Sequence, residues 1–320
     1  MKASIGDYIG YRLGNVESAY RLAYKKLTHK SAPKHSINGS KILTCEEANS
    51  AISDKINNNE PLMVARFGSV ELQFLNKYLC KCLGIIDDYP LSNRHTICNN
   101  AGFFPNNSSE MDKFAQLMLK SSSALDIIAL WNDTHENHIV RKYAQGAKGT
   151  LLEYIRPCFY NNTWTRALAG KKVCVVHPFC NTIISQYERR ELIYPKGELP
   201  EFDLRVVKAV QTIAGTNDNR FSTWFDALDY MKEQISSEDF DVAILGCGAY
   251  GFPLAAYVKS IGKKAVHLGG TTQLMFGIRG SRWKDDSEIG KKLYNDYWVY
   301  PSDEDTPKNF KQVENGCYWK

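Results

Sequence analysis

The stretch DFDVAILGCGAYGFPLAAYVKSIG, residues 239–262, joins a short apolar run to an apolar helical segment through a glycine-rich turn. The first part has the length of a buried strand, and the last part has the period of a helix. Between them Gly246, Gly248 and Gly251 form a G-x-G-x-x-G pattern that also contains Tyr250. Glycines let a backbone approach a phosphate closely, and a helix start offers unpaired N–H groups. The stretch predicts a strand–turn–helix unit that binds a phosphate-bearing ligand, with a tight packing turn as the alternative.

Similar apolar runs recur along the chain and are separated by segments with helical periodicity. Continuous apolar strands that alternate with helices are typical of a parallel sheet covered on both faces. We therefore expect an α/β fold with a Rossmann-like parallel sheet and helices on both faces. In such sheets ligands bind beyond the carboxyl ends of the strands. The runs are PLMVARF (61–67), LDIIALW (125–131), KKVCVVHPF (171–179) and KKAVHLGG (263–270).

The segment before the first run predicts a helical arm and a linker. Residues 8–28 fit one amphipathic helix, which we expect Gly10 and Gly14 to interrupt, and the polar stretch KSAPKHSINGS after it is typical of a linker. Thr44 then opens a helix through a capping box with Glu47. This divides the chain into an arm and linker over residues 1–43 and a single domain over residues 44–320.

Composition and targeting signals indicate a protein of the cytoplasm. The chain has 320 residues with 43% hydrophobic content, which is enough for a full core. We find no apolar run of the roughly 20 residues that a membrane-spanning helix requires, and the start, MKASIGDYIGYRLG, lacks the apolar centre of a secretory signal. The nine cysteines are scattered, so we expect reduced thiols rather than a disulfide framework.

The formal net charge of +5 is concentrated at one end of the chain. Residues 1–37 hold seven basic and two acidic residues, so the remainder is neutral. A nucleic-acid-binding protein is expected to spread its basic excess over a folded surface, and this distribution argues against that class. The arm is predicted either to contact the inner face of the cytoplasmic membrane or to pack as a helix on the domain.

An oxidoreductase is the first alternative that the glycine pattern raises. Dinucleotide-binding folds place an acidic residue at the end of the next strand, about 20 residues on, to bind the ribose. His267 occupies that place here, and only 69 residues follow Gly251. We therefore expect no NAD(P), and the same missing acid argues against a methyltransferase.

The first strand-to-helix turn, ARFGSVE, carries further candidate site residues. The guanidinium of Arg66 can pair with a phosphate, and Glu71 can act as a base or hold a divalent cation, with Gly68 and Ser69 between them. The alternative is an Arg–Glu pair that only closes the start of a helix.

Three other segments add candidates. CNNAGFFP, residues 98–105, predicts a loop whose amides and aromatic rings recognise a sugar or base, with Asn100 and Gly102 as binding residues. The alternative is that Phe103 and Phe104 are core residues. His177 stands at a strand end, where a structural role is the alternative. WNDTHENH, residues 131–138, offers Asp133 as a second candidate base beside His135 and Glu136, or simply a helix cap. A metal pair of His135 and His138 lacks a third ligand in register.

Taken in order, these motifs resemble the GT-D type glycosyltransferases of bacterial surface-polysaccharide synthesis. The resemblance rests on the R-F-G-x-x-E turn, on the late strand with its small-residue turn, and on a PF…Q…LP stretch. That stretch reads Pro178, Phe179, Gln186, Leu199 and Pro200. The resemblance covers residues 45–283, and the tail VENGCYW (313–319) is similar to a branch associated with capsule or lipopolysaccharide loci.

The resemblance implies a UDP-sugar donor, a glycan or lipid-linked glycan acceptor, and a D-x-E motif that assists Mn²⁺ or Mg²⁺. Here that motif reads Ser69-Val70-Glu71, and a hydroxyl is a weak ligand for a hard cation, which weakens the expected metal site. We expect displacement at the anomeric carbon with inversion, with Glu71 or Asp133 as the base. A non-catalytic nucleotide- or glycan-binding protein is the alternative.

Overall fold

The structure is a computed structural model whose described residues form one sheet of seven strands in the order β5-β4-β3-β9-β8-β6-β7. Every neighbouring pair in this sheet is parallel. The described residues are 5–30, 32, 34, 36–131, 135–216, 218–285 and 287–320. The strands are β3 (Leu62–Ala65), β4 (Ile127–Leu130), β5 (Lys148–Leu151), β6 (Lys172–His177), β7 (Asp203–Lys208), β8 (Val242–Leu245) and β9 (Lys264–His267).

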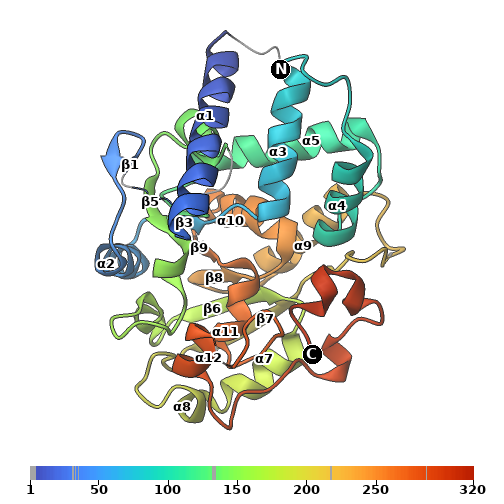
Figure 1. The fold of residues 1–320 in the computed structure, drawn as a ribbon. Coiled ribbons are helices and arrows are strands. Elements are labelled where there is room, and N and C mark those ends of the chain that lie inside the picture. Colours follow the sequence, from blue (N-terminus) through green and yellow to red (C-terminus); the bar gives the residue numbers. More distant parts are fainter. Residues whose placement is uncertain are drawn as a thin grey trace.

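Helices cover both faces of this sheet, and Figure 1 shows α3, α5 and α10 above it and α7, α8 and α12 below. The longer helices are α1 (Ile5–Thr28), α2 (Cys45–Asn57), α3 (Ser69–Cys82), α4 (Leu91–Ala101), α5 (Ser108–Ser121), α9 (Trp224–Ser237) and α10 (Gly251–Ser260). The shorter helices are α6 (Glu136–Tyr143), α7 (Cys180–Tyr187), α8 (Arg190–Ile193), α11 (Thr272–Met275) and α12 (Glu288–Leu293).

The central strands are buried on both faces because successive side chains of a strand point in opposite directions. In β8, Val242 and Ile244 pack into the core between the sheet and α7. Ala243 and Leu245 pack into the core between the sheet and α10. Strands β3, β4 and β6 alternate between the same two cores. This double burial explains why the strands are continuous apolar runs, and it confirms the predicted α/β class and all five predicted strands.

The sheet has two strands that the sequence did not indicate, β5 and β7, one at each edge. Strand β7 is only partly buried, with Lys208 exposed at its end, so it lacks a continuous apolar run. Strand β5 contains Gly149, over which Ile37 and Ile42 pack closely. Edge strands have one unpaired side and weaker patterning, which is why periodicity alone did not identify them.

Of three local predictions, one was wrong, one was confirmed, and the third, the linker, proved to contain short strands. The expected linker contains a hairpin of β1 (Ser36–Ile37) and β2 (Ser40–Lys41), closed by Asn38 and Gly39, both with positive φ. The segment 98–105 is not wholly a loop, because its first four residues form the last turn of α4. The capping box of Thr44 and Glu47 begins α2 as expected.

Helix α1 is continuous through Gly10 and Gly14, which contradicts the expected interruption. The two glycines lie one turn apart and face α6, where a Cβ atom at either position would collide with an imidazole ring, of His138 and His135 respectively. Tyr11 stacks on His135 with 4.6 Å between the ring centroids. The glycines therefore let α1 approach α6 closely. Within the described residues, no helix has the length and apolarity needed to cross a membrane.

We predict that Gly14→Ala weakens the docking of α1. Glycine to alanine normally stabilises a helix interior by about 0.5–1 kcal/mol, but the new methyl group here would lie 2.5 Å from Nδ1 of His135. Limited proteolysis should therefore cleave α1 faster in Gly14→Ala than in the wild type. Gly6→Ala, at an exposed position of the same helix, is the matched control and should not increase cleavage. Equal protection of Gly14→Ala and the wild type would contradict the close contact.

Candidate functional site

The topology creates a crevice between β6 and β8. The chain leaves β6 through α7 to reach β7 on one side, and it leaves β8 through α10 to reach β9 on the other. Helices α7 and α10 pack on opposite faces of the sheet, so the loops after the two strands diverge. Ligands of open parallel sheets bind at such a switch point, beyond the carboxyl ends of the strands.

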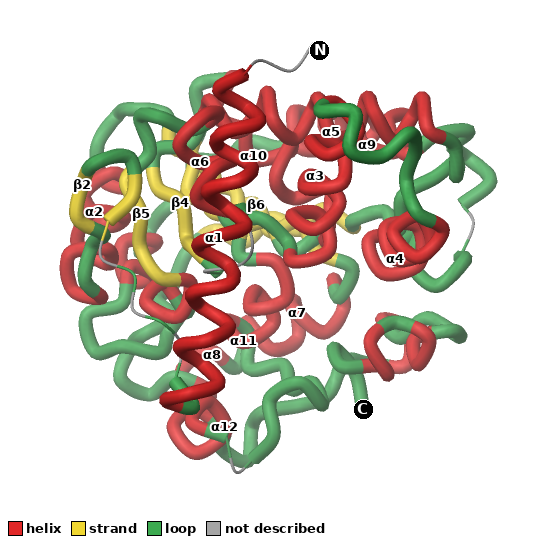
Figure 2. The backbone as a smooth tube through the Cα atoms, turned by 45° about the horizontal axis from the view of Figure 1, so that its top comes forward, coloured by secondary structure: helices red, strands yellow, loops and turns green. Residues whose placement is uncertain are grey.

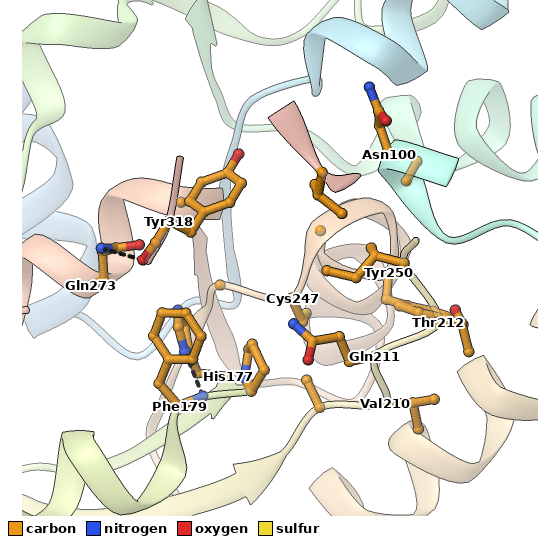
Figure 3. Close-up of a pocket in the computed structure, with 18 of the residues that line it drawn as sticks. Asn100, His177, Phe179, Val210, Gln211, Thr212, Cys247, Tyr250, Gln273 and Tyr318 are labelled. Carbon is orange, nitrogen blue, oxygen red and sulfur yellow. Dashed lines mark hydrogen bonds between the residues drawn. The ribbon is translucent and has the colours of Figure 1, made fainter. Parts of the chain in front are cut away.

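A cleft occupies this position and encloses about 720 Å³ of empty space, open solvent included. Figure 3 shows the side chains of Asn100, His177, Gln211, Tyr250 and Tyr318 arranged around it. Its lining within the described residues contains one arginine and several amide, hydroxyl and aromatic groups, but no carboxylate. The cleft is therefore rich in hydrogen-bond donors and suits an anionic ligand.

The glycine-rich turn forms the floor of the crevice. The Gly246 N–H donates to the carbonyl of Val176 at 2.9 Å, and a Cβ on Gly246 would collide with the ring of His177 and with Thr272. Gly248 has φ of +58° and would direct a Cβ into open space. It begins a short 3₁₀ turn, Gly248–Tyr250, that runs into α10. N–H groups at such a start have no partner within their helix and are available to a ligand.

Arg66 follows β3 and supplies the positive charge of the cleft. Among the described residues its guanidinium makes one hydrogen bond, from Nη1 to the carbonyl of Phe67 at 3.1 Å, and its buried Nε has no partner. Its Nη2 lies against Gly269, which has no side chain to obstruct it, and the ring of Trp131 lies 5.7 Å from Cζ. Most of the donor capacity of Arg66 is therefore unused by the protein.

Two buried histidines near the strand ends are neutral. Burial lowers the pKa of His177 to about 3, and burial together with the nearby charge of Arg66 lowers the pKa of His267 to about 3. Nδ1 of His177 accepts a hydrogen bond from the Phe179 N–H at 3.0 Å, so its proton is on Nε2. His177 can then donate a hydrogen bond to a ligand, but it cannot act as a base of ordinary strength.

Glu71 lies outside the described lining of the cleft. It is in the first turn of α3, where its carboxylate packs over Gly68. Burial raises its pKa, whereas the charge of Arg66 and a hydrogen bond from its own N–H lower it. The side chains of Arg66 and Glu71 form no ion pair within 4.0 Å among the described contacts, so the alternative of a direct Arg–Glu pair is not what the structure shows. Ser69 Oγ accepts a hydrogen bond from Gln73 at 3.3 Å.

The described residues do not assemble a site for a divalent cation. The described residues contain no group of three or more His, Cys, Asp or Glu side chains that could hold a metal. Glu71 is a single carboxylate, it lies at the start of its own helix, and Arg66 is close enough to lower its pKa. Hard cations require several oxygen ligands. The cationic and N–H groups described above are therefore the groups of the described cleft that could contact an anion.

The other predicted binding residues lie in or beside the cleft. Asn100, at the end of α4, lines it. Gly102 has φ of +70°, and its carbonyl accepts from the Thr212 hydroxyl at 2.6 Å. The Thr212 hydroxyl also lies 3.2 Å from that of Tyr250, which lines the cleft and stacks on Trp224. Gly251 packs against the ring of His267 and does not line the cleft.

The segment 131–138 contributes little to the described lining. Asp133, the second candidate base, lies outside the described residues. His135 and His138 face the glycines of α1, and the buried Glu136 accepts a hydrogen bond from the Trp131 N–H at 3.0 Å. These three side chains therefore serve the packing of α6.

Several lining residues were not identified from the sequence as site residues. Gln211 and Thr212 follow β7, the edge strand that was missed, so their position at a strand end was not evident. Val313, Tyr318 and Trp319 come from the C-terminal tail, which folds back over the cleft. The segment VENGCYW follows the last strand by many residues, so the sequence alone did not indicate that it lines the cleft. Gln273 lines the cleft from α11.

Comparisons with known proteins identify no family. No protein-family model matches the chain, and no curated protein matches it. Among solved structures the chain is similar to a selenomethionine-substituted domain of unknown function 1792 (DUF1792), with 13% sequence identity and a TM-score of 0.44. The match covers 83% of this chain and 93% of that chain. The name of that domain assigns no activity, so the chemistry of the cleft is inferred from its own residues.

We predict that Gly248→Ala lowers the affinity of the cleft for an anion by more than its loss of folding stability explains. A left-handed conformation costs a non-glycine residue about 1–2 kcal/mol, and the added methyl group projects into the space that a phosphate would occupy. Gly170→Ala is the matched control, because Gly170 has φ of +67°, equally open space and an exposed position away from the cleft. Both variants should melt at similarly reduced temperatures. Calorimetry with pyrophosphate should show weaker binding only for Gly248→Ala, and equal affinities would remove the turn from the site.

Proposed function

We propose that this chain is a glycosyltransferase that uses a nucleotide-sugar donor, with a uridine diphosphate sugar as the leading candidate. The observation that carries the proposal is the guanidinium of Arg66, which has a buried, unpartnered Nε in a cleft shared with the turn Gly246–Gly248. A guanidinium and free N–H groups at a helix start are the groups that bind a diphosphate. The neutral Nε2–H of His177 adds a third kind of donor.

The remaining lining suits the other parts of such a donor. Tyr318 is half-buried and lines the cleft, so its aromatic ring is a surface on which a nucleobase can stack. Burial raises the pKa of Tyr318 to about 12, so its hydroxyl stays protonated. The amides of Asn100 and Gln211 offer both donors and acceptors to ribose or sugar hydroxyls. The resemblance of the sequence motifs to GT-D type glycosyltransferases supports the same assignment.

In the proposed reaction an acceptor hydroxyl attacks the anomeric carbon of the donor sugar with inversion. The new carbon–oxygen bond forms as the bond to the diphosphate breaks, and the diphosphate leaves with the electron pair. Arg66 and the N–H groups of the glycine-rich turn stabilise its negative charge. A carboxylate takes the hydroxyl proton, with Glu71 or Asp133 as the candidate base. The acceptor is a glycan or lipid-linked glycan of capsule or lipopolysaccharide synthesis.

A second candidate function is a nucleotide- or glycan-binding protein without catalytic activity. It is favoured by the absence of a carboxylate from the described lining and by the buried position of Glu71. A donor bound by Arg66 and the turn would then have no base beside its sugar. The two functions share the binding step and differ only in turnover.

The binding step is tested by Arg66→Ala. Thermal-shift and calorimetric titrations with uridine diphosphate should show at least about tenfold weaker binding, equivalent to ~1.4 kcal/mol, because a principal charge partner of the diphosphate is lost. Arg205→Ala is the control, since Arg205 pairs with Asp203 on the outer strand β7. Titrations with Mn²⁺ and with EDTA measure any metal contribution. Unchanged affinity in Arg66→Ala would contradict the site, and binding of NADH instead of nucleotides would indicate an oxidoreductase.

The base is tested by comparing Glu71→Gln with Asp133→Asn. Both changes keep the size of the side chain and remove its charge, so loss of a base should lower turnover by roughly 10²-fold or more with little change in melting temperature. We predict this loss for at least one of them, measured as sugar transfer or donor hydrolysis per folded molecule. A structural Glu71 would instead lose stability in Glu71→Gln, with activity following the folded fraction. Binding without turnover in the wild-type protein, over a panel of acceptors, would support the non-catalytic alternative.

A further inference from the structure

Helix α1 carries its apolar side chains on the face directed away from the protein. Leu13 is 60% exposed, Val16 is 67% exposed and Leu27 is 82% exposed. A helix on the surface of a globular protein normally turns its apolar face toward the core. Figure 2 shows α1 lying along the outside of the molecule. The complete exposed set on this helix is Ile5, Tyr8, Ile9, Leu13, Val16, Tyr20, Leu22 and Leu27.

The face of α1 that contacts the protein consists of glycines, polar side chains and the ring of Tyr11. Gly10 and Gly14 lie against the histidines of α6, as described above. Asp7 forms an ion pair with Lys142, and Asn15 Oδ1 lies 2.9 Å from Nε2 of His135. The helix is thus fixed in the orientation that exposes its apolar face, because turning it over would break these contacts.

The charges on α1 are divided in the same way. Its two acidic residues, Asp7 and Glu17, face the protein, where Glu17 contacts Asn137 and pairs with Arg21 at 2.5 Å. The exposed charges of the described segment 5–30 are all basic. They are Arg12, Lys25, Lys26 and Lys30.

We propose that the outer face of α1 binds a lipid surface with negatively charged headgroups. Exposed apolar side chains can enter the boundary between headgroups and acyl chains, while the basic residues contact the anionic headgroups. Tyr8 and Tyr20 suit this boundary, since an aromatic ring with a polar end prefers the interface. This inference rests on α1 alone and does not depend on what the cleft binds.

A second copy of this chain is a less suitable partner for the same face. Ile9, Leu13, Val16 and Tyr20 do follow the spacing of a coiled-coil seam. Self-pairing would place the basic residues of both copies beside one seam, and the exposed face has no acidic residue to offset them. An anionic surface satisfies both the apolar and the basic residues.

The test is co-sedimentation of the full chain with vesicles. Wild-type protein should bind vesicles of phosphatidylcholine with about 30% phosphatidylglycerol, and the bound fraction should fall as salt rises from about 0.1 M to about 0.5 M. The double variants Leu13→Ser/Val16→Ser and Lys25→Glu/Lys26→Glu should each bind at least about tenfold more weakly. These side chains are exposed, so both variants should keep the wild-type melting temperature.

The control variant is Ile184→Ser/Leu192→Ser, which removes two exposed apolar side chains far along the chain, in α7 and α8. It should bind vesicles like the wild type. Absence of wild-type binding, or equal binding to pure phosphatidylcholine, would overturn the proposal. A wild-type dimer in sedimentation velocity that becomes a monomer in Leu13→Ser/Val16→Ser would overturn it in favour of a second copy.

Discussion

Strand β8 is hydrogen-bonded on both sides, to β6 and to β9, and all four of its residues are buried. This parallel pairing fixes where the chain emerges from the sheet at Gly246, directly beside the end of β6. Because the connections after β6 and β8 pass over opposite faces, the space above their ends stays open. The close pairing also explains the need for glycine, since any side chain at position 246 would collide with His177.

The electrostatics of the cleft follow from burial rather than from a network of ion pairs. Burial keeps His177 and His267 neutral, and the described lining has no carboxylate, so the positive charge of Arg66 is not cancelled within the cleft. Burying a charge that is not paired costs solvation free energy, and a bound anion would offset that cost. Glu71 lies close enough to interact with Arg66 but outside the lining. The proposed donor diphosphate would be an anion of the kind that offsets this charge.

Helix α1 shows a different use of the same physical principles. Its glycines let the helix backbone approach α6 closely, and its large apolar side chains remain exposed to solvent. A stripe of Tyr and Leu residues among basic residues does not indicate, from sequence alone, which face of the helix packs against the rest of the protein. The orientation is decided by the rings of His135 and His138, which leave no room for a side chain at Gly14 or Gly10.

Local sequence determined a large part of this protein. The apolar runs specified five central strands, because strands buried on both faces must be apolar throughout, and the box of Thr44 and Glu47 specified the start of α2. The glycine pattern specified a turn between a strand and a helix. Tertiary structure alone decided the rest. It brought Gln211 from an edge strand and Tyr318 from the tail to the cleft, and it buried Glu71 at the start of its own helix. These outcomes depend on contacts between segments that are distant along the chain, and periodicity describes only the neighbours of each residue in sequence.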